Sequence, residues 1–155
     1  MARTRAAIPF PALAYGLAGL IPFLAGAGAI ALHRLSSLAV LPLEALYGAV
    51  ILSFLGGARW GIEIRREAPR FGVITLTMAP SVVGFLTAGV AVTAGADNSV
   101  VGAGCLVQLA VMFLIHWLWD VTAKEAPDWY PRLRSILTLV AVASLIYCAF
   151  GVFSL

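Results

Sequence analysis

Five long runs without formal charge dominate the sequence and limit its fold more than any other feature. A helix needs about 20 apolar residues to cross the hydrocarbon core of a bilayer. The charge-free runs cover residues 6–32, 45–58, 71–96, 98–119 and 135–155, and the second extends upstream past Glu44 to Leu38. We therefore predict an all-α integral membrane bundle, a single transmembrane domain over residues 1–155. Its five transmembrane helices are expected at about 11–32, 42–61, 72–94, 99–119 and 131–153.

The composition excludes the main soluble classes. Only 11% of the residues are charged and 62% are hydrophobic, whereas a soluble domain carries about 25% charged residues. A soluble enzyme, a disordered tail and a nucleic-acid-binding domain are therefore excluded. Cys105 and Cys148 both lie in apolar runs, so there is no disulfide framework or zinc-ligand spacing. We expect no metal, no cofactor and no nucleic-acid partner.

The distribution of basic residues predicts the orientation in the membrane. Nine of the ten Lys and Arg residues fall in the N-terminus, the second loop and the fourth loop, and only Arg34 falls in the first loop. The positive-inside rule then gives an N-in/C-out topology. Arg3 and Arg5, followed by an apolar run, also resemble the start of a signal peptide. The run is longer than a usual signal core, so we expect the first helix to be retained.

Prolines and polar residues predict where three of the helices begin. Pro42 suits the first turn of the second helix, and Glu44 then acts as a helix-start carboxylate. Asn98, with its two polar neighbours, offers capping groups for the fourth helix, and Pro131 suits the start of the fifth. Pro22 falls inside the first helix, where we expect a kink.

Small residues recur at every fourth position of the second helix. Steps of four form a slowly drifting stripe on a helix, and small side chains let two helices approach closely in lipid. The stripe either packs against other helices of the same chain or forms a docking face for a partner. Its members, widened by Gly56, are Ala45, Ala49, Ser53, Gly57 and Gly61.

Polar and aromatic residues gather at the predicted cytoplasmic ends of the second and fourth helices. They are Arg59, Trp60, Glu63, His116, Trp117, Trp119 and Asp120. A charge at this depth needs a partner, so we expect Arg59 to pair with Asp120, with Glu63 as the local alternative. The structural interpretation is an ion pair that stabilises the fold beside an aromatic belt. The alternatives are a proton path and a pocket for a lipid headgroup or a quinone ring, lined by His116, Arg59 and the indoles.

One string in the second helix carries a family resemblance. Residues 47–61 read YGAVILSFLGGARWG, and a second recurring segment is formed by Asp120, 127–134 and 137–138. These segments resemble the domain-of-unknown-function 3429 family of transmembrane protein 69-like small membrane proteins. The resemblance implies a multi-helix protein, mitochondrial in eukaryotes and of the inner membrane in bacteria. It brings no activity, so no catalytic residue is carried over.

Function is predicted from what the apolar spans contain. They hold no nucleophile, acid–base pair or metal cluster, so we expect no enzymatic activity. The first, third and fifth helices carry no ionisable group near mid-membrane, which argues against a channel or pump. We expect an accessory, scaffold or assembly subunit of an inner-membrane complex, and the resemblance makes a respiratory complex one candidate. Its partners would be membrane lipids and another membrane protein or a second copy.

The alternative is a small carrier or a lipid- or quinone-binding protein with a pocket at the cytoplasmic ends of the second and fourth helices. In either case we expect a multi-pass protein of the bacterial inner (cytoplasmic) membrane, or of the mitochondrial inner membrane if the source is eukaryotic.

Overall fold

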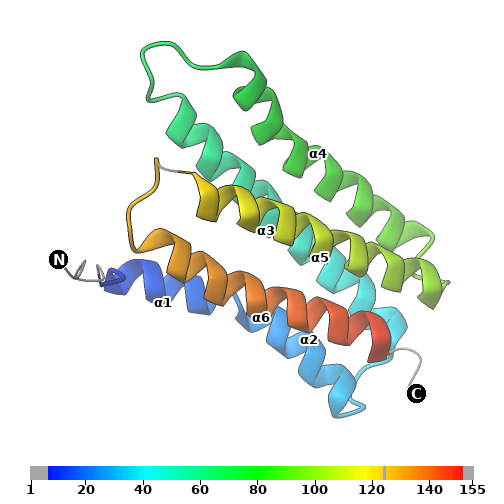
Figure 1. Cartoon of the computed structure of the whole chain (residues 1–155). Helices are drawn as coiled ribbons and strands as arrows, with labels where there is room; N and C mark the ends of the chain where they lie inside the picture. Colours follow the sequence, from blue (N-terminus) through cyan, green and yellow to red (C-terminus); the bar gives the residue numbers. More distant parts are fainter. Residues whose placement is uncertain (1–6, 124, 152–155) are drawn as a thin grey trace.

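Helices account for nearly all of the backbone that the structure describes, residues 7–123 and 125–151 of a computed structural model (Figure 1). Five stretches are long and apolar enough to cross a membrane, as predicted. The first stretch is built from two helices, and each of the others is a single helix. The helices are α1 Phe10–Ala18, α2 Ile21–Ala31, α3 Ser37–Glu63, α4 Phe71–Thr93, α5 Ser99–Thr122 and α6 Tyr130–Gly151.

The first span is broken, where the sequence predicted one continuous helix over 11–32. α1 ends at Ala18 and α2 begins at Ile21, so Gly19 and Leu20 form the break. Pro22, the second residue of α2, has no N–H to donate to the carbonyl four residues earlier. The kink expected at Pro22 is therefore present as a full interruption. The hydroxyl of Tyr47 on α3 donates to the carbonyl of Gly19, at 2.9 Å, and so gives this carbonyl at the break a hydrogen-bond partner.

The second span begins earlier than predicted. α3 starts at Ser37 rather than at Pro42, so Pro42 lies inside the helix and not in its first turn. The expectation that Glu44 is a helix-start carboxylate is wrong for the same reason. Glu44 lies two turns inside α3 and is only 4% exposed. Its carboxyl occupies the space that a Cβ on Gly26 of α2 would fill.

The remaining helix starts agree with the sequence. The side chain of Asn98 caps α5 by accepting from the backbone N–H groups of Val100 and Val101, at 3.0 and 3.3 Å. Pro131 is the second residue of α6, where its missing N–H costs no helical hydrogen bond. α5 continues to Thr122, three residues beyond the predicted end. The predicted end of the last helix, near 153, lies outside the described residues.

The five spans alternate in direction, so the loops divide between two ends of the bundle (Figure 1). One end holds the start of α1, both ends of the 64–70 loop, the end of α5 and the start of α6. We call it the basic end, because Arg59, Arg65, Arg66, Arg70, Arg132 and Arg134 lie at it. Of the described basic residues, only Arg34 lies at the opposite end.

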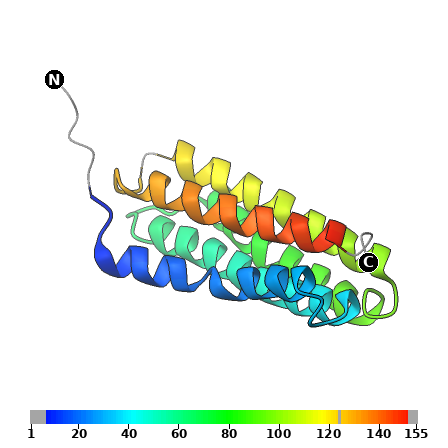
Figure 2. The ribbon, with the colours of Figure 1, turned by 90° about the horizontal axis from the view of Figure 1, so that it is seen from below.

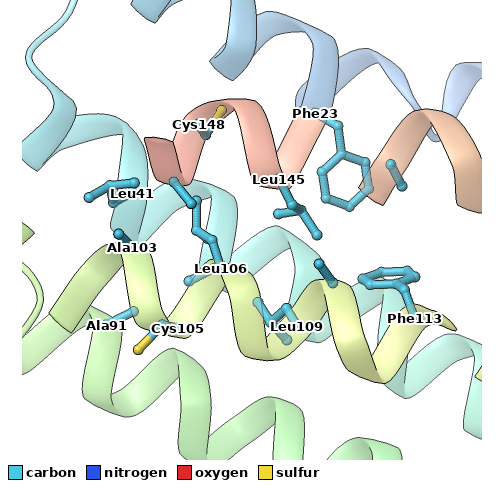
Figure 3. Packing of buried hydrophobic residues seen from close by; sticks show 14 of the residues in the cluster. Phe23, Leu41, Ala91, Ala103, Cys105, Leu106, Leu109, Phe113, Leu145 and Cys148 are labelled. Carbon is cyan, nitrogen blue, oxygen red and sulfur yellow. The ribbon is translucent and has the colours of Figure 1, made fainter. Parts of the chain in front are cut away.

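α3 is the central helix of the bundle and packs against α2, α4, α5 and α6. α4 lies on one side of it, and α1, α2 and α6 lie together on the other (Figures 1 and 2). Large apolar side chains fill the space between them (Figure 3). The largest fully buried ones are Phe23, Leu41, Leu52, Leu106, Leu109, Phe113 and Leu145.

The outward surface of the spans is also apolar. Phe71, Phe85 and Val82 on α4, for example, are 86%, 76% and 57% exposed. Side chains of this kind are stable on the outside of a bundle only where lipid rather than water surrounds them. The surface therefore agrees with a bundle that lies in a membrane.

Candidate functional site

A buried carboxylate joins three helices at the basic end. Asp120 on α5 is 0% exposed, and each of its oxygens receives one arginine. Nε of Arg59, on α3, donates to Oδ1 at 2.6 Å, and Nε of Arg134, on α6, donates to Oδ2 at 2.6 Å. The Arg59–Asp120 pair expected from the sequence is therefore formed. We call Arg59, Asp120 and Arg134 the Asp120 cluster.

The Asp120 cluster carries more positive than negative charge. Two guanidinium groups face one carboxylate, so the three side chains sum to +1, and both arginines are only 5% exposed. Arg59 gains a further hydrogen bond from Nη2 to the carbonyl of Trp119, at 2.9 Å, and its Cζ lies 5.2 Å from the centre of the Trp119 ring. These contacts replace part of the water that the buried charge has lost.

Glu63 pairs with Arg70 rather than with Arg59. Both oxygens of Glu63 accept from Arg70, at 2.9 Å from Nε and 2.7 Å from Nη2. Arg66 approaches the same carboxylate at 3.8 Å. Hydrogen bonding to Glu63 raises the pKa of Arg70 above its usual value. The local Arg59–Glu63 alternative is therefore not the arrangement that forms.

The structure distributes the predicted pocket residues over several surfaces. Arg59, Glu63 and Trp119 line a pocket of about 360 Å³ at the ends of α3, α4 and α5. His116 instead lies against α4 beside an apolar hollow, with Nδ1 3.4 Å from Oδ2 of Asp120. Trp117 faces α6, where its Nε1 donates to the hydroxyl of Ser135, and Trp60 is 41% exposed. The residues share one depth but not one cavity.

Sequence reasoning assigned Arg134 only a topological role and missed its place in the cluster. Tyr130 was missed too; its hydroxyl lies 3.4 Å from Oδ2 of Asp120. A signal was present in the sequence. Tyr130, Arg134 and Thr138 recur at every fourth position of a mostly apolar helix, so they lie on one face and meet the same neighbour.

The small-residue stripe divides between the inside and the outside of the bundle. Ala49, Ser53 and Gly56 pack against α4, with the hydroxyls of Ser53 and Ser81 2.9 Å apart. A Cβ on Gly56 would lie 2.5 Å from the carbonyl oxygen of Thr77. These three positions therefore serve packing within the chain. Since four residues advance a helix by about 40° more than a full turn, the stripe drifts outward beyond Ser53.

Gly57 and Gly61 lie on the outward side of α3. A Cβ on either residue would meet nothing within 4 Å. Val50 and Phe54 precede them on the same side, 63% and 69% exposed, and Ile64 follows them, 44% exposed. We call these five residues the outer face of α3. It forms a notch at the two glycines between larger apolar side chains.

A family model described as "Protein of unknown function (DUF3429)" matches residues 8–150, nearly the whole chain. The match includes α3, both parts of the first span and every member of the Asp120 cluster. It agrees with the resemblance carried by the sequence of α3.

Two curated relatives are both named transmembrane protein 69. The chain is 37% identical over 142 residues to the relative from Xenopus tropicalis and 32% identical over 144 residues to the relative from Mus musculus. These alignments cover 89% of the chain, but only 53% and 55% of the relatives. The chain thus spans about half the length of the curated relatives it matches. No solved structure matches significantly.

Proposed function

The chain belongs to the DUF3429 family of proteins of unknown function, so the family brings no activity and the exposed surfaces of the chain indicate its role. We propose that it is an accessory, scaffold or assembly subunit that binds another membrane protein through the outer face of α3. The observation that carries this proposal is the open space over Gly57 and Gly61. Without a driving force from water, helices in lipid associate by close packing at small residues.

The contact between α3 and α4 shows that small residues on α3 already serve close helix packing in this protein. Ala49, Ser53 and Gly56 on the same helix already bring α4 into close contact. The two glycines that follow offer the same kind of surface and contact no helix among the described residues. The described loops are short as well, so the surface available for a partner lies mainly within the spans. We propose the inner membrane as the location, with a respiratory complex as one candidate partner.

The alternative role, a carrier or a lipid- or quinone-binding protein, has weaker support at the pocket predicted for it. Arg70, which lines this pocket beside Arg59, already binds Glu63 and lies 3.7 Å from Glu125. The charges there are therefore largely engaged with one another.

Purification in a mild detergent distinguishes the two roles. We expect the tagged protein to carry a stoichiometric protein partner, and Gly57→Leu to lose this partner because the added side chain fills the notch. Gly89→Leu is the matched control, since Gly89 on α4 is also exposed and a Cβ there also meets nothing within 4 Å. Loss of the partner from both variants, or from neither, would refute the proposal. A stoichiometric lipid without a protein partner would favour the alternative role.

A further inference from the structure

A cavity of about 110 Å³ lies beside the Asp120 cluster, between α1, α2, α3, α5 and α6. Its walls are mostly apolar and include Leu20, Phe23, Leu55, Phe113 and Ala141. The rings of Phe23 and Phe113 meet edge to face, with their centres 6.0 Å apart (Figure 3). A cavity of roughly 150 Å³ holds a molecule the size of benzene, so this one accommodates a small head or a few carbons of a chain.

One end of the cavity is polar. Arg134 and Thr138 lie one turn apart on α6, line the cavity and are only 5% and 3% exposed. Neither Nη2 of Arg134 nor Oγ1 of Thr138 has a hydrogen-bond partner among the described residues. Leaving such groups unpaired in an apolar interior is costly, typically about 1–3 kcal/mol each and more for a charged group.

The hydroxyl of Thr138 differs from other threonine hydroxyls in this protein. Those of Thr77, Thr87, Thr93 and Thr122 each donate to a carbonyl of their own helix, at 2.7–2.8 Å. This is the usual way in which threonine satisfies its donor in a helix. Thr138 does not make this bond, so its hydroxyl is free to bind a group in the cavity.

The net positive charge of the Asp120 cluster favours an anionic ligand in the cavity. Nε of Arg134 is engaged by Asp120, and Asp120 also binds Arg59, so the Asp120 cluster retains one positive charge. The next carboxylate, Glu63, is held by Arg70. A single oxyanion accepting from Nη2 of Arg134 and Oγ1 of Thr138 would balance the cluster and satisfy both donors.

The cavity opens on the side of the bundle, between α1 and α3. Tyr15 on α1 and Phe54 on α3 line it, yet are 81% and 69% exposed, and both lie in membrane spans. Arg134 lies one turn inside the start of α6, whereas Ala141 lies two turns deeper. An amphiphile with its head at Arg134 therefore has its chain directed along α6 and out between α1 and α3, toward the centre of the bilayer.

We propose that this cavity binds a single-chain anionic amphiphile, with its oxyanion head on Arg134 and Thr138 and the first carbons of its acyl chain packed against Phe23 and Phe113. A carboxylate and a phosphate monoester share this chemistry. The cavity adjoins the outer face of α3, because Phe54 belongs to both, but neither Gly57 nor Gly61 lines it.

Equilibrium binding of radiolabelled palmitate to the full chain in a neutral maltoside detergent tests the proposal, with empty micelles as background. We expect saturable binding near one molecule per chain. Thr138→Val keeps the side-chain volume but removes the hydroxyl, and it should weaken binding by about tenfold. Thr87→Val is the matched control, since Thr87 is equally buried but lies on α4 and bonds its own helix. Ala141→Leu, which fills the cavity, should abolish binding.

Competition identifies the head. Hexadecan-1-ol has the same chain without a charge and should compete poorly. Palmitoyl lysophosphatidate should compete; if it does so better than unlabelled palmitate, the natural ligand carries a phosphate, and if worse, a carboxylate. No saturable binding by the wild type, equal binding by Thr138→Val, or equal competition by hexadecan-1-ol would each overturn the proposal. Thr138→Val adds no volume, so we expect it to fold normally. An unchanged melting temperature would show that a loss of binding does not reflect misfolding.

Discussion

Nε of Arg134 lies 2.6 Å from Oδ2 of Asp120, and neither side chain is more than 6% exposed. Together with the contact from Arg59, this bond connects α6 and α3 to α5 through a single carboxylate. The cluster is therefore a buried polar connection between three helices at the basic end.

Removing the charge of Asp120 should destabilise the bundle strongly. Asp120→Asn leaves two buried guanidinium groups facing each other without their counter-ion, and breaking a buried pair in this way costs about 3–5 kcal/mol. The free energy of unfolding in mixed micelles measures the loss. Glu44→Gln is the matched control, because Glu44 is also buried but forms no ion pair among the described residues. Equal stability changes in the two variants would contradict the role of the cluster.

Exchanging the charges of Arg59 and Asp120 should not restore full stability. Asp120→Arg would place a guanidinium against Arg134, so the double variant with Arg59→Asp gains one attraction and one repulsion. We expect a double-mutant cycle to place it above Asp120→Arg, which carries two repulsions, but still well below the wild type. Adding Arg134→Gln should then restore part of the loss. A double variant that recovers fully without this third change would show that Arg134 is not coupled to the pair.

Adjacent glycines on α3 should respond differently to the same substitution. Gly56→Ala places a methyl group 2.5 Å from the carbonyl oxygen of Thr77, so α4 must move, at a cost of about 1–3 kcal/mol. Gly57→Ala meets nothing within 4 Å and should be neutral or slightly stabilising, since alanine favours the helix. Thermal unfolding of both variants in detergent measures the contrast. Similar melting temperatures would contradict the close α3–α4 seam.

The orientation remains a prediction from the basic residues. A reporter that is active only outside the cytoplasm should be active when fused after Leu155 and silent when inserted in the 65–70 loop. Activity in the loop and silence at the C-terminus would reverse the N-in/C-out topology.

The sequence predicts well what depends on composition and on the order of the helices. The five spans follow from hydropathy, and the Arg59–Asp120 pair follows from alternating helix direction, which brings the two residues to one end. The role of Arg134 does not follow, because direction gives depth but not which helix faces which. Arg134 was counted as a loop charge, although it lies one turn inside α6 and its side chain is buried.

The helix boundaries show a second limit. Proline usually marks a helix start, as Pro22 does for α2, yet Pro42 lies inside α3. In a bundle, side chains of other helices supply partners for backbone at a break, as Tyr47 does for the carbonyl of Gly19. The division of the small-residue stripe was equally hidden, because the drift of a stripe is visible in sequence but the position of α4 is not.

The central claim is that the outer face of α3 contacts another membrane protein, and site-specific photo-crosslinking in intact membranes tests it most directly. A photoreactive residue at Gly57 should give one discrete protein adduct, whereas the same residue at Gly89, which is also exposed, should give none. Lipid adducts alone at both positions would contradict the claim and would show that α3 faces only the bilayer.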